Sequence, residues 1–223
     1  MSLFKRMTFD VTQGDAVVSS VRTSELPSVL RQWRDPGCCL ALWQRSLAPD
    51  LVRRLDRLSV EDLPVARFLT TPEDAGRKIA ASLLASGLPD TSLMTALGQD
   101  MAHLVTVFAA AAKSPSVDVR IEAVEGDACR RFHTDVSAAR LVTTYIGPGT
   151  VWVPPDWADE ALRLQEAFTG TLWEMPRFSV GMFGGSEAPG GGLVHRSPRL
   201  TGTGRFRLFF CLNQPQALSR APH

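Results

Sequence analysis

The chain has 223 residues, 44% of them hydrophobic and 21% charged, and its 24 basic residues almost balance its 23 acidic ones. A chain of this length and composition can bury a core without disulfides or metal ions and is typical of one soluble globular domain. The balanced charge argues against a nucleic-acid-binding surface, which usually needs a basic excess, and against a disordered acidic or basic protein.

Three features of the sequence favour a cytoplasmic location without a membrane partner. The longest apolar stretch, around residues 101–112, contains His103 and Thr106 and is too short to span a bilayer. Residues 1–14 lack the apolar run and the small-residue cleavage site of a secretory signal. The four cysteines are an adjacent pair and two distant single residues, which is not the pattern of a disulfide framework.

The first part of the chain, residues 1–115, is expected to be mainly helical. Thr71 precedes a proline and two acidic residues, which is a helix start, and Gly87 is typical of a helix end. The stretch 90–113 is apolar nearly all round, as in a helix packed inside a domain. The expected elements are a short amphipathic piece at 24–33, a strand at 39–43, and helices over 49–58, 72–86 and 90–113.

Residues 116–214 change to a β pattern. The segment 117–123 alternates apolar and charged residues, and later short apolar segments are separated by Gly and Pro turns. Many short strands with such turns suggest a β-sandwich or jelly roll. The expected strands are 117–123, 129–135, 141–146, 151–153, 178–183, 193–195 and 206–212, with one helix at about 159–168. The sequence therefore predicts a single α+β domain, residues 1–223, in which a helical N-terminal layer packs on this core and residues 215–223 form a tail.

The candidate chemistry centres on two histidines and an aspartate. His133 and Asp135 form an H-x-D tripeptide, and strand alternation would point both side chains to one face. His195 lies in a second strand-like segment after a glycine-rich run. Two histidines and one carboxylate can form the facial triad that binds Fe(II) and leaves coordination positions open. Arg205, ten residues after His195, could pair with an acid group held near the metal.

These pieces resemble the Fe(II)/2-oxoglutarate dioxygenase superfamily over about residues 117–213. The matching segments are FHTD at 132–135, GLVHRSP at 192–198 and GRFRLFF at 204–210. The resemblance implies a double-stranded β-helix of the jelly-roll, cupin-like kind and Fe(II) on the triad. It also implies that the distal Arg205 holds the far carboxylate of 2-oxoglutarate. The superfamily commonly has Ser two residues after that Arg, whereas this chain has Arg207.

Arg207, Tyr145 and the run 184–192 complete the set of candidate site features. Two guanidinium groups on one strand face, Arg205 and Arg207, would suit a doubly charged co-substrate or a different anion. Tyr145, the only tyrosine, could donate its hydroxyl to a co-substrate carboxylate, or it could be a half-buried aromatic with its hydroxyl in water. We interpret the glycine-rich run 184–192 as a lid or loop.

A second resemblance covers nearly the whole chain. The pattern C-x-x-[FW]-H-x-D at residues 129–135 and the pattern R-L-x-x-T-Y-x-G-P-G-T-x-W-V at 140–153 are similar to those of an uncharacterised bacterial family. The element Trp43-Gln44-Arg45 also resembles that family. The family has no assigned reaction, and its members are similar in context to zinc-homeostasis accessory proteins.

Three hypotheses about function follow. The first is a mononuclear non-haem Fe(II) oxygenase that uses a 2-oxoglutarate-like small-molecule co-substrate and oxidises an organic substrate. The second is a non-catalytic zinc-binding or metal-handling protein, in which Cys129 joins the triad as a thiolate ligand. Against it, Cys129 lies two strand alternations from His133 and could instead be a buried small hydrophobic residue. The third is an interaction module in which these polar residues coincide by chance.

Overall fold

The computed structural model describes residues 20–88, 90–186, 188 and 192–215. The strands are β1 (Val21–Ser24), β2 (Leu40–Trp43), β3 (Ala66–Thr70), β4 (Val117–Val124), β5 (Arg140–Ile146), β6 (Val151–Trp152), β7 (Trp173–Glu174), β8 (Val180–Phe183), β9 (His195–Arg196) and β10 (Arg207–Asn213). The helices are α1 (Pro49–Leu55), α2 (Pro72–Ala85), α3 (Thr91–Ala112) and α4 (Ala158–Leu164), and the 3-10 turns are η1 (Pro27–Arg34), η2 (Val60–Asp62), η3 (Pro155–Trp157) and η4 (Gln165–Ala167). Apart from Pro215, the predicted tail 215–223 lies outside the described residues.

The strands form two sheets. The large sheet has the order β1-β2-β8-β5-β10-β4-β3, and the small sheet has the order β7-β6-β9. An isolated bridge between His133 and His195 adds the loop before β5 to the β9 edge of the small sheet. From β4 onward the chain passes back and forth between the sheets: β4, the His133 loop, β5, then β6 and β7, then β8, β9 and β10.

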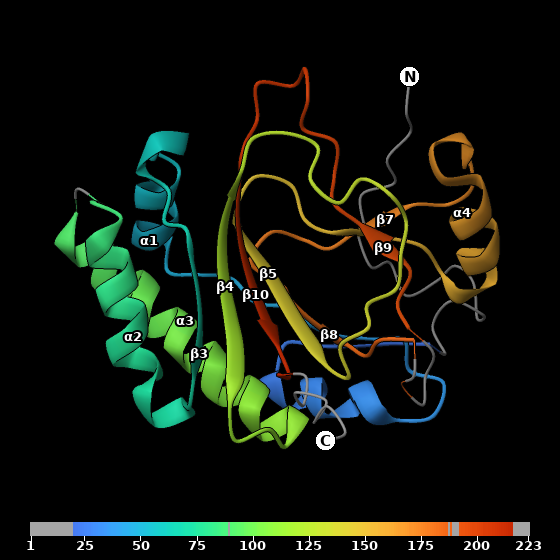
Figure 1. Ribbon diagram of the computed structural model, residues 1–223, viewed down its shortest axis with the longest axis horizontal. Coiled ribbons are helices and arrows are strands. Elements are labelled where there is room, and N and C mark those ends of the chain that lie inside the picture. The colour runs from blue at the N-terminus through green and yellow to red at the C-terminus, as the bar shows by residue number, and fades with distance from the viewer. Residues whose placement is uncertain (1–19, 89, 187, 189–191, 216–223) are drawn as a thin grey trace, which may run out of the picture.

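This winding is that of a double-stranded β-helix, with β4-β10-β5-β8 in one sheet and the His133 bridge with β9-β6-β7 in the other. The predicted α+β fold class is confirmed. Figure 1 shows that α1, α2 and α3 lie on one side of the large sheet, whereas the small sheet and α4 lie on the other. None of these helices therefore lies between the two sheets (Figure 1), where a cavity is lined by residues of both.

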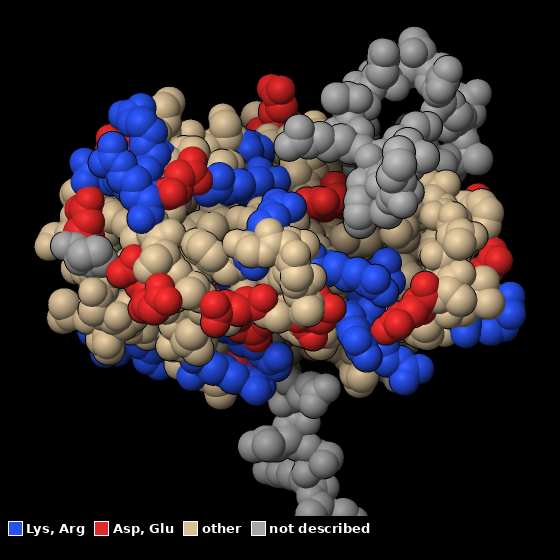
Figure 2. Space-filling view, turned by 90° about the horizontal axis from the view of Figure 1, so that it is seen from above, with Lys and Arg blue, Asp and Glu red and all other residues tan. Residues whose placement is uncertain are grey.

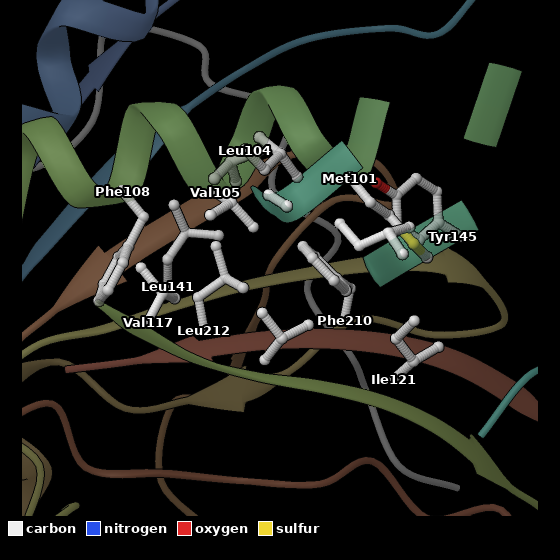
Figure 3. Close-up of a cluster of buried hydrophobic side chains, with 14 of the residues drawn as sticks. Met101, Leu104, Val105, Phe108, Val117, Ile121, Leu141, Tyr145, Phe210 and Leu212 are labelled. Carbon is white, nitrogen blue, oxygen red and sulfur yellow. The ribbon is translucent and has the colours of Figure 1, made fainter. Parts of the chain in front are cut away.

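Helix α3 is the central helix of the core. Asp90 caps it by accepting hydrogen bonds from the backbone N–H groups of Ser92 and Leu93, and it ends at Lys113 in the left-handed conformation. Its buried face packs on the large sheet (Figure 3), and each fully buried large side chain there stabilises the fold by roughly 1.5–3 kcal/mol. The labelled members of this cluster are Met101, Leu104, Val105, Phe108, Val117, Ile121, Leu141, Tyr145, Phe210 and Leu212. Among the described residues, α3 is also the one helix that is long and apolar enough to cross a membrane, although the same composition fits a core helix.

The predicted helices of the first part of the chain form a layer on the large sheet (Figure 1), and this part also supplies three strands. Strands β1 and β2 extend the large sheet at one edge and β3 extends it at the other. The sequence predicted β2 and missed β1, β3 and the two-residue β7. These strands are short and lie at sheet edges, so their pairing partners rather than their own hydrophobic pattern define them.

The prediction of a strand over residues 129–135 was wrong. In the structure this segment is a loop whose only bridge is the one at His133. Phe132, the residue before it, is buried and packs edge-on against Phe168 at a ring-centroid distance of 5.7 Å. Its backbone N–H also donates to the Gln165 side chain at 2.8 Å. These tertiary contacts, together with the bridge between His133 and His195, hold the loop in place.

Candidate metal centre

The backbones of His133 and His195 are held directly opposite each other. Each residue donates its N–H to the carbonyl oxygen of the other at 3.0 Å, which is the hydrogen-bonded pairing of antiparallel strands. The two imidazole rings consequently lie on the same side, with centroids 4.5 Å apart. Asp135 follows two residues after His133, and its carboxylate lies close to both imidazole rings. The structure thus brings together the three predicted ligands, and their ligating atoms all lie within 4.8 Å of one another.

Each imidazole is oriented by a carbonyl two residues earlier in the chain. Nδ1 of His133 lies 2.9 Å from the Arg131 carbonyl oxygen, and Nδ1 of His195 lies 2.9 Å from the Leu193 carbonyl oxygen. Because a carbonyl only accepts, we assign the proton to Nδ1 in both rings, which leaves the Nε2 lone pairs free. This is the arrangement that commonly orients metal-bound histidines.

Asp135 supplies the negative charge of the group. It is 7% exposed, and its Oδ1 forms an ion pair with Arg140 Nη1 at 2.8 Å. Its Oδ2 is buried without a hydrogen-bond partner among the described residues, and it lies 3.7 Å from His195 Nε2. A buried, unpaired carboxylate oxygen is costly unless a cation binds it. The orphaned oxygen and the two Nε2 atoms therefore fit a divalent metal ion as a facial triad.

The protonation state of His195 agrees with a role as a ligand. Burial lowers its pKa to about 4, and the Asp135 charge only partly opposes this effect. The ring is thus neutral at pH 7, with Nε2 available to a metal without loss of a proton. Phe183 packs against it at a ring-centroid distance of 5.0 Å and contributes to its burial.

The triad opens into a cavity of about 200 Å³ between the two sheets, and Arg207 also lines this cavity. Arg207 is 3% exposed, and its Nη2 donates to the hydroxyl oxygens of Thr144 at 2.9 Å and Thr150 at 2.8 Å. No carboxylate among the described residues forms an ion pair with it. Burial lowers its pKa to about 10, so the guanidinium is still charged at pH 7. An unpaired buried cation beside a candidate metal site favours an anionic ligand.

The turn after β5 positions Thr150 at Arg207. Gly147 has φ of 83°, a left-handed conformation that glycine adopts without steric cost. A Cβ atom on Gly149 would lie 1.8 Å from the Met175 carbonyl oxygen, so only glycine allows this close approach. The Gly-Pro-Gly run is therefore needed to bring the Thr150 hydroxyl to the guanidinium.

Two expected site residues lie elsewhere. Arg205 is exposed in the turn before β10, and it lines an adjoining outer groove rather than the cavity of the triad. Tyr145 is fully buried on the α3 face of β5 (Figure 3), where its hydroxyl donates to Asp100 Oδ2 at 2.5 Å. Successive strand residues face opposite sides, so Thr144 faces the cavity and Tyr145 faces the helix. Neither alternative for Tyr145 was right, because it does not reach the cavity and its hydroxyl is not in water.

Two further predictions concerned Cys129, as a zinc ligand or a buried small residue, and the glycine-rich run 184–192, as a lid or loop. Cys129 is exposed rather than buried, and it lines the cavity. Its sulfur is not part of the group of metal-ligating atoms within 4.8 Å of one another, which among the described residues comprises the triad alone. Of the predicted lid 184–192, residues 187 and 189–191 lie outside the described part of the chain.

The sequence reasoning missed four residues that line or shape the site: Arg140, Thr144, Thr150 and Arg196. Thr144 and Thr150 stand inside the T-Y-x-G-P-G-T pattern, and Arg140 begins the same segment. In the sequence analysis that pattern supports the family resemblance and no prediction of pocket residues. A strand ending in a glycine turn with hydroxyl residues on one face was the available signal for a polar pocket. Arg196 carried no signal beyond its place next to His195.

The fold and the His-Asp-His group define a double-stranded β-helix protein with a candidate metal centre. More specifically, the chain belongs to the family described as "Protein of unknown function (DUF1826)", whose model matches residues 24–213. The predicted membership of an uncharacterised family is confirmed. No curated protein matches the sequence at a significant level.

Several solved structures are similar at low identity. A rice dioxygenase for auxin oxidation has a TM-score of 0.47 and 12% identity, over 87% of this chain and 82% of that one. A Pseudomonas putida prolyl-4-hydroxylase has a TM-score of 0.46 and 14% identity, over 88% and 97% of the two chains. The Kdo hydroxylase KdoO, described as a non-heme Fe(II) alphaketoglutarate-dependent dioxygenase, has a TM-score of 0.46 and 10% identity, over 87% and 89%. Likenesses this distant do not assign a function.

Proposed function

We propose that this protein is a mononuclear non-haem Fe(II) oxygenase that uses 2-oxoglutarate, or a closely similar dianion, to oxidise an organic substrate. The observation that carries the proposal is the shared cavity of two features: a His-Asp-His ligand set with an orphaned carboxylate oxygen, and a buried guanidinium without an acidic partner. The first fits a divalent metal, and the second fits the far carboxylate of a co-substrate chelated to that metal.

His133, Asp135 and His195 would hold the metal. The two Nε2 atoms and Asp135 Oδ2 are the free donor atoms, because both Nδ1 atoms and Asp135 Oδ1 are engaged by other protein groups. When bound, Fe(II) supplies the activation of O₂. The role of Arg140 would be to fix the Asp135 carboxylate through Oδ1, so that Oδ2 stays free beside His195 Nε2.

Arg207 would bind the far carboxylate of the co-substrate. Its guanidinium is fixed by the hydroxyls of Thr144 and Thr150, which orient it without neutralising its charge. The planar group can then make two parallel hydrogen bonds to a carboxylate. This role was expected of Arg205, and the exposed position of Arg205 supports Arg207 in its place.

A zinc-binding role without catalysis is the second candidate, because the exposed Cys129 thiol lines the same cavity. The distribution of ligating atoms favours the oxygenase, since the triad forms a group without this sulfur. A zinc-storage site also gives no reason for an unpaired buried arginine.

The remaining sequence predictions are the cytoplasmic location and the absence of nucleic-acid and membrane partners. The face seen in Figure 2 carries Lys and Arg side chains interspersed with Asp and Glu, rather than one continuous basic surface. A nucleic-acid-binding protein usually presents a basic stripe or patch.

The proposal is tested by binding of 2-oxoglutarate to the Mn(II)-loaded protein, measured by calorimetry. Arg207→Gln should weaken binding roughly 10- to 100-fold, because a charge-assisted pair is removed. Arg205→Gln is the matched control and should leave the affinity unchanged. Equal affinities for the wild type and Arg207→Gln would overturn the assignment of Arg207, and no binding to the wild type would overturn the proposed co-substrate.

A further inference from the structure

A second cavity of about 600 Å³ adjoins the metal cavity, and Arg196 lines both of them. We call this second cavity the outer groove. It has a basic side formed by Arg196, Arg199 and Arg205, and an apolar side that includes Val151, Phe168 and Leu172. A substrate that reaches the metal from this direction therefore passes Arg196.

Arg196 is held in place although it has no acidic partner. Its guanidinium carbon lies 4.1 Å from the ring centroid of Phe132, a cation–π contact that fixes the side chain against the His133 loop. Neither Arg196 nor Arg205 forms an ion pair with any described carboxylate. Stacking leaves the edge of the guanidinium, with its N–H donors, free for another ligand.

The acidic residues of the outer groove are already engaged. Glu166 lies within ion-pair distance of Arg130 at 3.4 Å and of Arg199 at 3.9 Å. Glu174 accepts a hydrogen bond from the Gly149 backbone N–H at 2.9 Å. The groove lining thus carries three arginines against two glutamates, a basic excess, and neither glutamate forms an ion pair with Arg196 or Arg205.

We propose that the outer groove binds the oxidised substrate and that this substrate carries an anionic group, a carboxylate or a phosphate, on an apolar body. The anionic group binds Arg196, with Arg205 as a second, outer contact, and the apolar body lies against Phe168 and Leu172. This substrate class rests on the proposed oxygenase function, although the anion site itself can be tested without it. Arg207 is reserved for the co-substrate, so the two arginines recognise two different anions.

The test uses three probes of one size: phenyl phosphate, benzoate and the uncharged benzyl alcohol. Each is titrated calorimetrically into the Mn(II)-loaded protein, with and without saturating 2-oxoglutarate. We expect one or both anions to bind more tightly than benzyl alcohol, and to do so with 2-oxoglutarate present. The tighter of the two anions identifies the group that the substrate carries. Equal binding of benzyl alcohol, or loss of anion binding when 2-oxoglutarate is added, would overturn the proposal.

Substitutions then locate the site. Arg196→Gln should weaken anion binding roughly 10- to 100-fold and leave 2-oxoglutarate binding unchanged. Arg205→Gln, a change at an exposed position that folding tolerates, should weaken it several-fold. Arg163→Gln on α4, a solvent-facing arginine outside both cavities, is the control and should have no effect. Unchanged anion affinity in both Arg196→Gln and Arg205→Gln would overturn the assignment.

Failure of the oxygenase proposal has a different signature. If 2-oxoglutarate does not bind the wild type, the proposed function fails, while the titrations without 2-oxoglutarate still report on the outer groove. If 2-oxoglutarate binds and the anionic probes do not, the oxygenase proposal stands and the substrate class is wrong.

Discussion

His133 and His195 exchange two backbone hydrogen bonds, each N–H donating to the carbonyl oxygen of the other at 3.0 Å. The pair fixes the Cα positions of both residues, and the carbonyls of Arg131 and Leu193 then fix the imidazoles through Nδ1. The ligand geometry thus depends on backbone pairing and not on side-chain rotamers alone. Such a site is formed before the metal binds, which favours binding because little ordering remains to be done.

Replacing either histidine should abolish stoichiometric metal binding while the protein stays folded. His133→Ala and His195→Ala each remove one of two nitrogen donors from a three-ligand set, and two ligands rarely retain a divalent ion. The measurement is metal content per chain after anaerobic loading and dialysis, with circular dichroism as the check on folding. His103→Ala, at an exposed position on α3, is the matched control. One equivalent of metal retained in both ligand variants would refute the site.

Arg140→Gln should lower metal affinity by about 10- to 100-fold, the usual effect of losing a partner that orients a ligand. The guanidinium forms an ion pair with Asp135 Oδ1 at 2.8 Å, and its Nε donates a hydrogen bond to the Asn213 side chain at 2.8 Å. Without the Arg140 guanidinium the Asp135 carboxylate can rotate, so its oxygens are no longer held in position for the metal. Arg140→Lys should restore part of the affinity. An affinity that rises in Arg140→Gln would show that charge repulsion, and not orientation, is the main effect of Arg140.

Tyr145→Phe should reduce stability and leave 2-oxoglutarate binding unchanged. The hydroxyl donates to Asp100, a carboxylate that also pairs with Arg45, so its loss leaves a partly buried charged group with one hydrogen bond fewer. The expected cost is about 1–3 kcal/mol, measured by urea unfolding. A lowered affinity for 2-oxoglutarate at unchanged stability would instead place Tyr145 in the binding site.

The core of the fold could be predicted from the sequence where the pattern is long. The apolar stretch that forms α3 and the alternation that forms β4 are each long enough to be decisive. The edge strands β1 and β3 could not be predicted, because four or five residues without a clean pattern become strands only when a neighbour pairs with them. The segment 129–135 shows the converse, since its alternation is strand-like but only His133 forms a bridge, to His195, and the rest of the segment is a loop.

The candidate ligands could be predicted because H-x-D and a distal His are a compact chemical pattern. The arginine that would bind the co-substrate could not be predicted as well. Arg205 and Arg207 share strand parity, and only the start of β10 at Arg207 shows which of them is inside the sheet. Tyr145 was expected at the cavity, but its neighbour Thr144 faces the cavity instead. Which of the two does so depends on the side of the strand on which α3 packs.

Cys129→Ser separates the two candidate functions. The oxygenase account predicts an unchanged zinc and iron affinity, because the thiol is not among the clustered ligand atoms. Competition with a chromophoric chelator gives both affinities. A loss of zinc affinity of tenfold or more, with no loss for iron, would favour the zinc-handling function.

The most direct test of the central claim is one visible absorption titration. The anaerobic protein is loaded with one equivalent of Fe(II), and 2-oxoglutarate is added. The account predicts a charge-transfer band that saturates at one equivalent in the wild type and needs roughly 10- to 100-fold more 2-oxoglutarate in Arg207→Gln. No band in the wild type, together with tight binding of zinc, would contradict the oxygenase and leave metal handling as the function of the site.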